Sequence, residues 1–143
     1  MADPEDQLRT IAGKLGIGAY RRHVFLCTGP SCCTPEDGVA AWEALKGEIK
    51  QHGLGTGPDA CYRSKVGCLR VCCHGPTAVV YPEGTWYHGL TADRVPRFVR
   101  EHLLGGRPVA ESVFAHNPLP PAGPPAGQGG GPAGEPGMSA PHP

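Results

Sequence analysis

The segment VGCLRVCCHGP, residues 66–76, holds three of the seven cysteines of this chain. Its Gly67, Gly75 and Pro76 permit or fix backbone angles that regular elements avoid, so the segment is predicted to be a loop. The apolar run that follows, residues 77–81, is typical of a β-strand. The chain is therefore expected to carry a cysteine loop that leads directly into a strand.

A second cysteine cluster lies upstream in the segment CTGPSCC, residues 27–33. It also borders a strand-like run, residues 22–26, but here the strand comes first and the loop follows. Two separate loops thus supply thiols, and a binuclear iron–sulfur cluster needs four thiolates, two for each iron. The pattern favours a metal or redox role for the cysteines.

The spacing of the cysteines leaves three kinds of site open. Four residues separate Cys27 from Cys32, three separate Cys68 from Cys72, and no C-x-x-C motif of the thioredoxin type is present. Structural zinc sites usually take closer pairs, and a Rieske-type centre needs two histidines, whereas the first cysteine loop has none. An iron–sulfur cluster is favoured, and a zinc-stabilised binding module and a thiol-based redox protein remain alternatives.

Composition narrows the functional class further. The 143 residues carry 13 basic and 13 acidic side chains, and this balance gives no sign of a nucleic-acid or membrane partner. No apolar run approaches the roughly 18 residues of a membrane span, and the acidic N-terminus does not resemble a signal peptide. The expected location is the cytoplasm, where an odd number of cysteines indicates metal or redox chemistry rather than disulfides.

Hydrophobic periodicity predicts an α/β fold with a small mixed sheet flanked by helices. Strands at 22–27 and 59–66 are expected to be parallel neighbours, joined by a right-handed crossover through a helix at 35–52. A hairpin at 77–88 and a helix at 92–104, capped by Thr91 or Asp93, complete the domain. The buried side chains expected on the two helices are Val39, Trp42, Leu45 and Ile49 on the first, and Val95, Phe98, Val99, His102 and Leu103 on the second.

The ends of the chain are predicted to differ from the domain at 21–116. Residues 1–20 form a helical extension whose amphipathic helix, at 4–15, is expected to pack on the domain, with a frayed extension as the alternative. Residues 117–143 contain nine prolines and seven glycines. Since this segment has almost no apolar side chains to bury, it is predicted to be a disordered tail.

Four motifs resemble the thioredoxin-like [2Fe-2S] ferredoxins: HVFLCT at 23–28, GCLRVCCHGP at 67–76, VVYPEGTWY at 79–87 and HLLGGRPV at 102–109. The resemblance covers about residues 23–110, and the chain is also similar to the thioredoxin-like iron–sulfur subunit of respiratory complex I. It implies a thioredoxin-like fold, a [2Fe-2S] cluster, and one-electron transfer with redox partner proteins rather than enzymatic catalysis. It also implies a homodimer.

Carried over by position, the resemblance implies that the cluster ligands are Cys27, Cys32, Cys68 and Cys72. Cys33 stays a candidate beside Cys32, although the preceding Ser31 matches the family's pattern of a small residue before the ligand. The remaining cysteines, Cys61 and Cys73, are expected to be bystanders. Trp86 and Tyr87 are expected to pack in a strand, with a dimer interface as the alternative.

Overall fold

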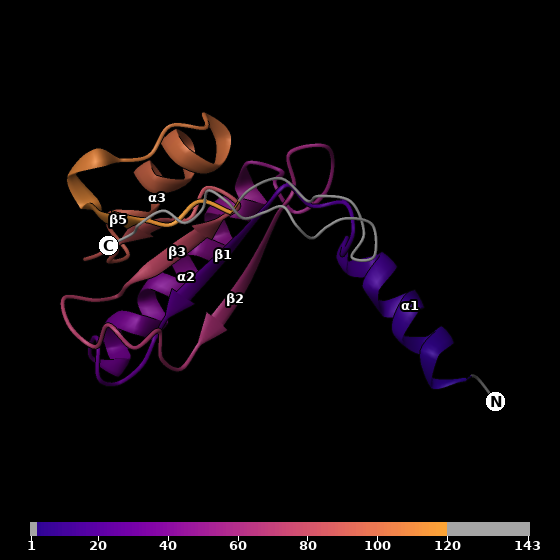
Figure 1. Ribbon diagram of the computed structural model, residues 1–143, viewed down its shortest axis with the longest axis horizontal. Coiled ribbons are helices and arrows are strands. Elements are labelled where there is room, and N and C mark those ends of the chain that lie inside the picture. Colours follow the sequence, from indigo (N-terminus) through magenta and orange to yellow (C-terminus); the bar gives the residue numbers. More distant parts are fainter. Residues whose placement is uncertain (1–2, 120–143) are drawn as a thin grey trace, which may run out of the picture.

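The computed structural model describes residues 3–119, which build a mixed five-stranded sheet in the order β2-β1-β3-β4-β5 (Figure 1). Strands β1 and β2 are parallel, and every other pair of neighbours is antiparallel. The predicted α/β class with a small mixed sheet is confirmed. The strands are β1 (Arg22–Cys27), β2 (Cys61–Val66), β3 (Ala78–Tyr81), β4 (Thr85–Tyr87) and β5 (Val113–His116).

Helix α2 (Pro35–Gln51) makes the crossover that places β2 beside β1. It begins where the Asp37 backbone N–H donates to the Thr34 hydroxyl at 3.1 Å, and Gly53 ends it in a left-handed conformation. Because the two strands are parallel, their carboxyl ends meet, with Cys27 opposite Val66. Both cysteine loops therefore start at the same end of the sheet, where β1 and β2 end.

The buried face of α2 is rotated from the predicted one. Leu45 and Ile49 are buried as expected, but Val39 is 60% exposed, and Gly38 and Ala41 take inner positions. Trp42 is only partly buried against the core. A Cβ atom at Gly38 would lie 2.8 Å from the carbonyl oxygen of Thr28, so the helix can touch the first cysteine loop only through a glycine.

The C-terminal helix consists of α3 (Val95–Phe98) and a π-helical continuation, η1 (Val99–Leu104). It begins after Arg94 rather than after Thr91 or Asp93, and this start keeps Pro96 in the first turn, where no N–H is needed. Both helices contact α2. The side chains predicted for the buried face are all buried: Val95, Phe98, Val99, His102 and Leu103.

A buried polar network fixes this helix to the sheet, from Tyr87 in β4 to Arg22 at the start of β1. The Tyr87 hydroxyl accepts the backbone N–H of Val109 at 3.0 Å, so its own proton is free to donate to His102 Nδ1 at 2.7 Å. The other ring nitrogen lies 3.8 Å from Glu83 Oε1, and Arg22 Nε donates to Glu83 Oε2 at 2.7 Å. Burial lowers the pKa of His102 to about 4.

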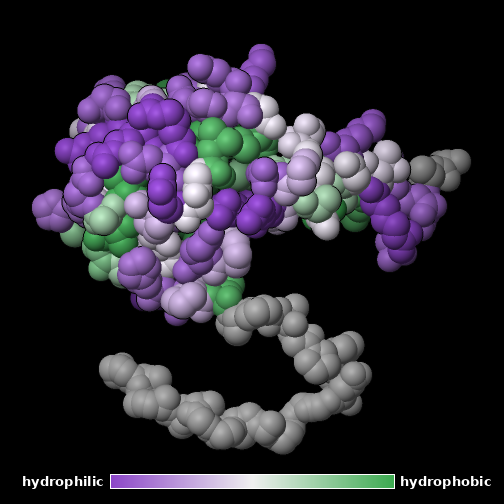
Figure 2. Space-filling model, turned by 90° about the horizontal axis from the view of Figure 1, so that it is seen from above, coloured by the Kyte–Doolittle hydropathy of each residue, from purple (hydrophilic) through white to green (hydrophobic). Residues whose placement is uncertain are grey.

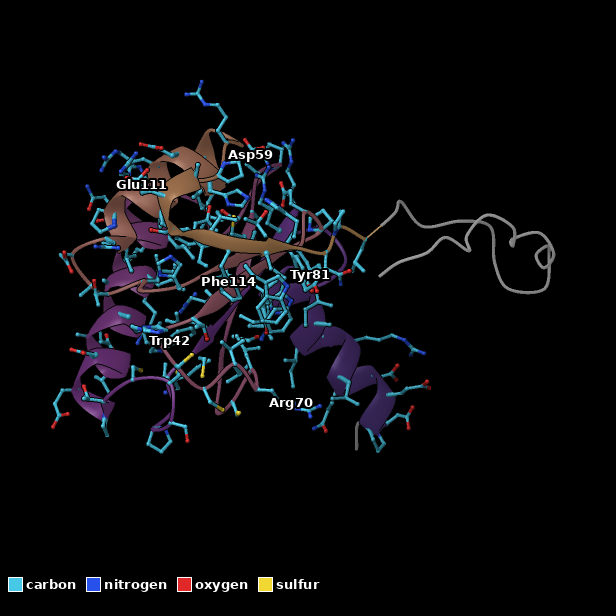
Figure 3. All side chains as sticks on the ribbon, turned by 60° about the vertical axis from the view of Figure 1, so that its left-hand side comes forward. Trp42, Asp59, Arg70, Tyr81, Glu111 and Phe114 are labelled. Atoms are coloured by element: carbon cyan, nitrogen blue, oxygen red, sulfur yellow. The ribbon has the colours of Figure 1, made fainter. Side chains whose placement is uncertain are left out.

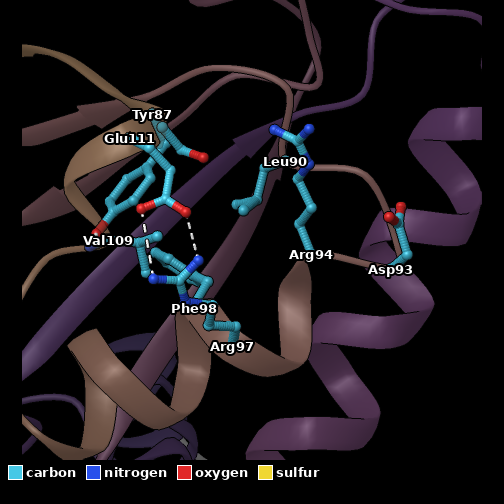
Figure 4. A pocket seen from close by; sticks show the side chains of 9 residues that line it. Tyr87, Leu90, Asp93, Arg94, Arg97, Phe98, Val109 and Glu111 are labelled. Atoms are coloured by element: carbon cyan, nitrogen blue, oxygen red, sulfur yellow. Dashed lines mark hydrogen bonds and ion pairs between the residues drawn. The ribbon is translucent and has the colours of Figure 1, made fainter.

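An ion pair lines the pocket beside Tyr87 (Figure 4). Arg97 pairs with Glu111, which lies in the short helix η2 (Ala110–Ser112), and its Nε donates to Glu101 at 2.8 Å. These contacts attach the chain after η1 to α3. The chain then enters β5, an edge strand that the sequence did not predict, and β5 pairs with β4.

Helix α1 (Pro4–Leu15) has the predicted bounds but not the predicted packing. It extends away from the sheet (Figures 1 and 2), and none of its residues is buried. Its apolar side chains Leu8, Ile11 and Leu15 are 63%, 51% and 46% exposed. The expectation that α1 packs on its own domain is therefore wrong. Over residues 3–119, no helix combines the length and apolar character needed to cross a bilayer.

The beginning of the predicted tail contacts the domain. The backbone N–H groups of Asn117 and Leu119 donate to the carbonyls of Gly84 and Pro82 at 2.7 and 3.1 Å. These contacts attach residues 117–119 to the β3–β4 turn. The rest of the tail predicted for 117–143 lies outside the described residues.

The face of the sheet opposite α2 carries a row of aromatic rings, which we call the aromatic face. Phe25, Val79 and Trp86 follow one another across β1, β3 and β4 on this face. His23 stacks on Phe25 with ring centroids 4.0 Å apart, and Trp86 meets Phe114 edge to face at 6.2 Å. The rings of the aromatic face are those of His23, Phe25, Tyr62, Tyr81, Trp86 and Phe114, of which Tyr81 and Phe114 are labelled in Figure 3.

Candidate metal centre

The first cysteine loop holds a buried pair of thiols. Cys27 is the last residue of β1, Cys32 lies just before α2, and their side chains are 2% and 5% exposed. Their Sγ atoms lie 2.9 Å apart, and both thiols are free. The end of a central strand and the start of the longest helix therefore position this pair.

The second cysteine loop holds an exposed pair. The Sγ atoms of Cys68 and Cys72 lie 3.8 Å apart, and both residues are exposed. The backbone takes positive φ values at three alternate residues, Arg70 (72°), Cys72 (59°) and His74 (54°). Such alternation turns successive N–H groups toward one side and forms anion-binding concavities, and here the Arg70 N–H donates to Cys68 Sγ at 3.1 Å.

Backbone contacts join the two loops. The Thr28 N–H donates to the Val66 carbonyl at 3.1 Å, and the Gly75 N–H donates to the Cys32 carbonyl at 2.8 Å. A Cβ atom at Gly75 would lie 2.6 Å from that same carbonyl oxygen and 2.9 Å from Cys32 Sγ. The loops can approach this closely at Cys32 because position 75 has no side chain.

The donor set fits metals that prefer sulfur. A tetrahedral metal bonded to sulfur at about 2.3 Å holds its ligand sulfurs about 3.8 Å apart, which is the spacing of Cys68 and Cys72. Cys27 and Cys32 lie closer and would separate on binding. Within residues 3–119, no three cysteine, histidine or carboxylate side chains converge as one metal site. The sulfurs occur as two pairs, which matches two metals with two thiolates each.

Burial raises the pKa of both Cys27 and Cys32. Each also meets groups that favour the thiolate: the backbone N–H of Leu69 and the hydroxyl of Thr77 lower the pKa of Cys27, and the backbone N–H of Thr77 lowers that of Cys32. The pKa of Cys72 is raised by its neighbour Cys68. Metal binding would therefore have to displace the thiol protons.

The structure separates the remaining cysteines by location. Cys33 Sγ lies 3.8 Å from Cys32 Sγ at the edge of the first pair, and Cys73 is exposed in the second loop. Cys61 is opposite Arg22 in the sheet, at the far end of β1 from Cys27, and burial raises its pKa to about 11. Cys61 therefore lies in the core, outside both cysteine pairs.

Sequence reasoning missed one residue of this site, Thr77. It is 0% exposed, and its carbonyl accepts the Cys27 N–H at 2.8 Å. Its hydroxyl has no hydrogen-bond partner among the described residues. Its position directly after the second cysteine loop was visible in the sequence, but its contact with the first loop depends on the antiparallel pairing of β1 and β3.

No protein-family model matches this chain. A protein named "Ferredoxin, 2Fe-2S" from Clostridium pasteurianum is 33% identical over 98 residues, which are 62% of this chain and 91% of that protein. A protein of the same name from Aquifex aeolicus (strain VF5) is 41% identical over 54 residues, which are 38% of this chain and 49% of that protein.

Solved structures give the same picture of the fold. The structure of a thioredoxin-like [2Fe-2S] ferredoxin from Aquifex aeolicus superimposes with a TM-score of 0.60 at 28% sequence identity. The superposition covers 73% of this chain and 99% of that one. The predicted thioredoxin-like arrangement of the sheet and helices is thereby confirmed.

Proposed function

Because this chain belongs to the thioredoxin-like [2Fe-2S] ferredoxins, we propose that it is a one-electron carrier with a cluster held by Cys27, Cys32, Cys68 and Cys72. The observation that carries the proposal is the occurrence of two sulfur pairs on two loops joined by backbone hydrogen bonds. A bound cluster supplies one centre that gains and loses a single electron. The chain holds that centre and shields one side of it from water.

In this proposal each loop serves one iron. Cys27 and Cys32, without their Sγ protons, would hold the iron on the buried side (the inner iron), and Cys68 and Cys72 would hold the iron on the exposed side (the outer iron). The backbone N–H of Leu69 lowers the pKa of Cys27, and the backbone N–H of Arg70 donates to Cys68 Sγ. Two N–H groups of the second loop therefore stabilise negative charge on sulfur, one at a cysteine of each pair.

Cys32 is the better second ligand in the first loop. Its sulfur lies 2.9 Å from Cys27 Sγ and is buried with it, whereas Cys33 is half-buried and lies beside Cys32. The Gly75 N–H also holds the Cys32 carbonyl against the second loop. We assign Cys33, like Cys73, no direct bond to iron.

In this proposal, electrons pass between the cluster and a partner protein through the exposed second loop. Cys68 and Cys72 reach the surface, and a hollow beside them is lined by Val71, Cys73, His74, His88 and Phe114. A partner oxidoreductase docked over this loop would approach the outer iron without moving the core. The chain acts as a carrier between such partners and has no reaction of its own.

The aromatic face supports a homodimer. Phe114 is 45% exposed in edge strand β5, and the Trp86 ring beside it is half-buried. Aromatic rings are enriched at interfaces between subunits. Phe114→Asp should shift the sedimentation coefficient from that of a dimer to that of a monomer, while Val39→Asp, an equally drastic change at an exposed position on α2, should not.

The proposal also includes the limits of the domain and the cellular location of the protein. The cluster-binding unit spans 21–116, after a helical extension at 1–20 and before the tail at 117–143. We place the protein in the cytoplasm, since seven free thiols suit a reducing compartment.

The test is a metal count followed by a redox titration. Anaerobically purified protein should contain about two iron and about two sulfide ions per chain and should take up about one electron per chain from dithionite. One zinc ion per chain without sulfide would instead establish the zinc-stabilised module. A metal-free protein that exchanges electrons through a disulfide would establish the thiol-based redox protein.

A further inference from the structure

Thr77 is the buried polar residue of the site that the proposed function leaves without a role. It lies between the second cysteine loop and β3, and its side chain is 0% exposed. Its carbonyl accepts the Cys27 N–H at 2.8 Å, and its N–H favours the thiolate of Cys32. One residue thus contacts both cysteines of the buried pair.

The Thr77 hydroxyl has no hydrogen-bond partner among residues 3–119. A buried hydroxyl without a partner costs about 1–3 kcal/mol, so such groups are rare in folded proteins. Cys27 Sγ is the candidate acceptor, because Cys27 is the residue whose backbone N–H the Thr77 carbonyl accepts at 2.8 Å, and the hydroxyl also lowers the pKa of the Cys27 thiol.

A thiol and a thiolate differ as acceptors for this hydroxyl. A neutral thiol is a weak acceptor, whereas a thiolate carries a negative charge that strengthens each hydrogen bond it accepts. Cys27 becomes a thiolate when it binds a metal. The acceptor that the Thr77 hydroxyl lacks is then created by the binding event.

We propose that Thr77 is a positioning residue that donates its hydroxyl proton to Cys27 Sγ in the cluster-bound protein and thereby raises the reduction potential of the cluster. This inference rests on the proposed function. Reduction adds negative charge to the cluster and its sulfurs, so a donor aimed at a ligand sulfur stabilises the reduced state more than the oxidised state.

Three variants of the full chain separate the hydroxyl from the shape of the residue. Thr77→Val keeps the shape and removes the donor, and Thr77→Ser keeps the donor. Thr85→Val makes the same chemical change at another buried threonine, in β4 next to the hairpin turn and away from the cysteines. Each protein is loaded with its cluster, and its midpoint potential is measured by protein-film voltammetry.

We expect Thr77→Val to have a lower potential than the wild type, and Thr77→Ser and Thr85→Val to match the wild type. In competition with a chelator, Thr77→Val should also hold iron about 10-fold more weakly, the lower end of the usual effect of removing such a partner. The iron–sulfur stretching bands in resonance Raman spectra should shift less on transfer to D2O in Thr77→Val than in Thr77→Ser.

An unchanged potential in Thr77→Val, with the cluster intact, would overturn the inference, as would equal shifts in Thr77→Val and Thr77→Ser. If Thr77→Val does not retain a cluster, Thr77→Ala removes the same hydroxyl without adding a methyl group. Cluster loss in both variants but not in Thr77→Ser supports the hydroxyl, and loss in all three assigns the role to packing. A wild-type protein without a cluster would refute the proposed function itself.

Discussion

The two cysteine loops each hold a pair of thiols, but one pair is buried and the other is exposed. The first loop keeps Cys27 and Cys32 inside the protein, between the end of β1 and the start of α2. The second loop exposes Cys68 and Cys72 and is shaped by positive φ angles at Arg70, Cys72 and His74 rather than by regular structure.

If the two pairs hold one centre, as we propose, this difference makes the centre both protected and accessible. Core packing sets the position of the buried pair, which lies between β1 and α2. Backbone conformation sets the exposed pair, and positive φ angles at residues other than glycine are unfavourable and need support from surrounding contacts. We therefore expect the buried half to tolerate fewer changes and the exposed half to respond more to charge and solvent.

The largest effect is expected from removing a ligand in either half. Replacing Cys27, Cys32, Cys68 or Cys72 by Ala should abolish or remodel the cluster, since each iron then lacks one of its two thiolates. Iron and sulfide content measured after reconstitution gives the result. Circular dichroism shows whether the variant is still folded.

The matched controls are the cysteines outside the two pairs. Cys33→Ala, Cys61→Ala and Cys73→Ala should retain the cluster, because none of these thiols belongs to a pair in the proposed assignment. Retention in Cys32→Ala together with loss in Cys33→Ala would show that the inner iron uses Cys33 instead.

The next largest effect is expected in the buried polar network that includes the far end of β1 and lies outside both cysteine pairs. His102 is buried with a pKa of about 4 against an ordinary value of 6.5. The unfolded chain therefore binds more protons, and stability is complete above pH 6.5 and falls as the pH drops toward 4. Since one pKa unit corresponds to about 1.36 kcal/mol, the full loss is about 3 kcal/mol.

His102→Gln should flatten this loss, since glutamine can still accept the Tyr87 hydroxyl but does not titrate. Urea unfolding of both proteins between pH 7 and pH 5 measures the difference in slope. The sign is the critical point: a wild-type stability that rises as the pH falls through this range would mean that His102 gains, rather than loses, from protonation.

A smaller effect separates the two glycines of the second loop. Gly75→Ala would push a methyl group to within 2.6 Å of the Cys32 carbonyl oxygen, whereas a Cβ atom at Gly67 meets nothing within 4 Å. Neither glycine has a positive φ angle. Overpacking of this kind costs about 1–3 kcal/mol, so Gly75→Ala should lose cluster and stability, and Gly67→Ala should keep both.

Cluster content and melting temperature of the two variants measure this contrast. Equal effects of the two substitutions would mean that the loops are not held together at Gly75, and the buried and exposed halves would then be independent of each other.

The smallest effect is electrostatic and belongs to the exposed half. Arg70 lies between Cys68 and Cys72, and a cation about 7 Å from the added electron contributes about 2 kcal/mol at an effective dielectric constant of about 20. Solvent screening reduces this severalfold. Since about 1.4 kcal/mol corresponds to about 59 mV for one electron, Arg70→Gln should lower the reduction potential by some tens of millivolts.

Arg70→Glu should lower the potential further, because it replaces a positive charge by a negative one. Protein-film voltammetry compares both variants with the wild type. A raised or unchanged potential with an intact cluster would mean that Arg70 points into solvent and does not act on the cluster.

The sequence predicted the regular core of the domain well because its signals are local. Thr34 and Pro35 mark the start of α2, and the five inward residues of the C-terminal helix recur at helical spacing. The motifs around the cysteines indicated the family before any contact was known.

The features that the sequence did not predict depend on tertiary contacts. Strand β5 has four residues, three of them exposed, and is defined by its pairing with β4. The rotation of α2 follows from the fit of Gly38 against the Thr28 backbone. Thr77 lies beside the first cysteine loop only because β1 and β3 are neighbours in the sheet, so the role of its hydroxyl could not be read from the sequence.

The most direct test of this account is the visible absorption spectrum of anaerobically purified wild-type protein. Four thiolates on two loops predict a red-brown protein with charge-transfer bands that are partly bleached when one electron is added. A colourless protein that binds zinc, or one that binds no metal, would contradict the claim that the buried and exposed cysteine pairs are two halves of one iron–sulfur centre.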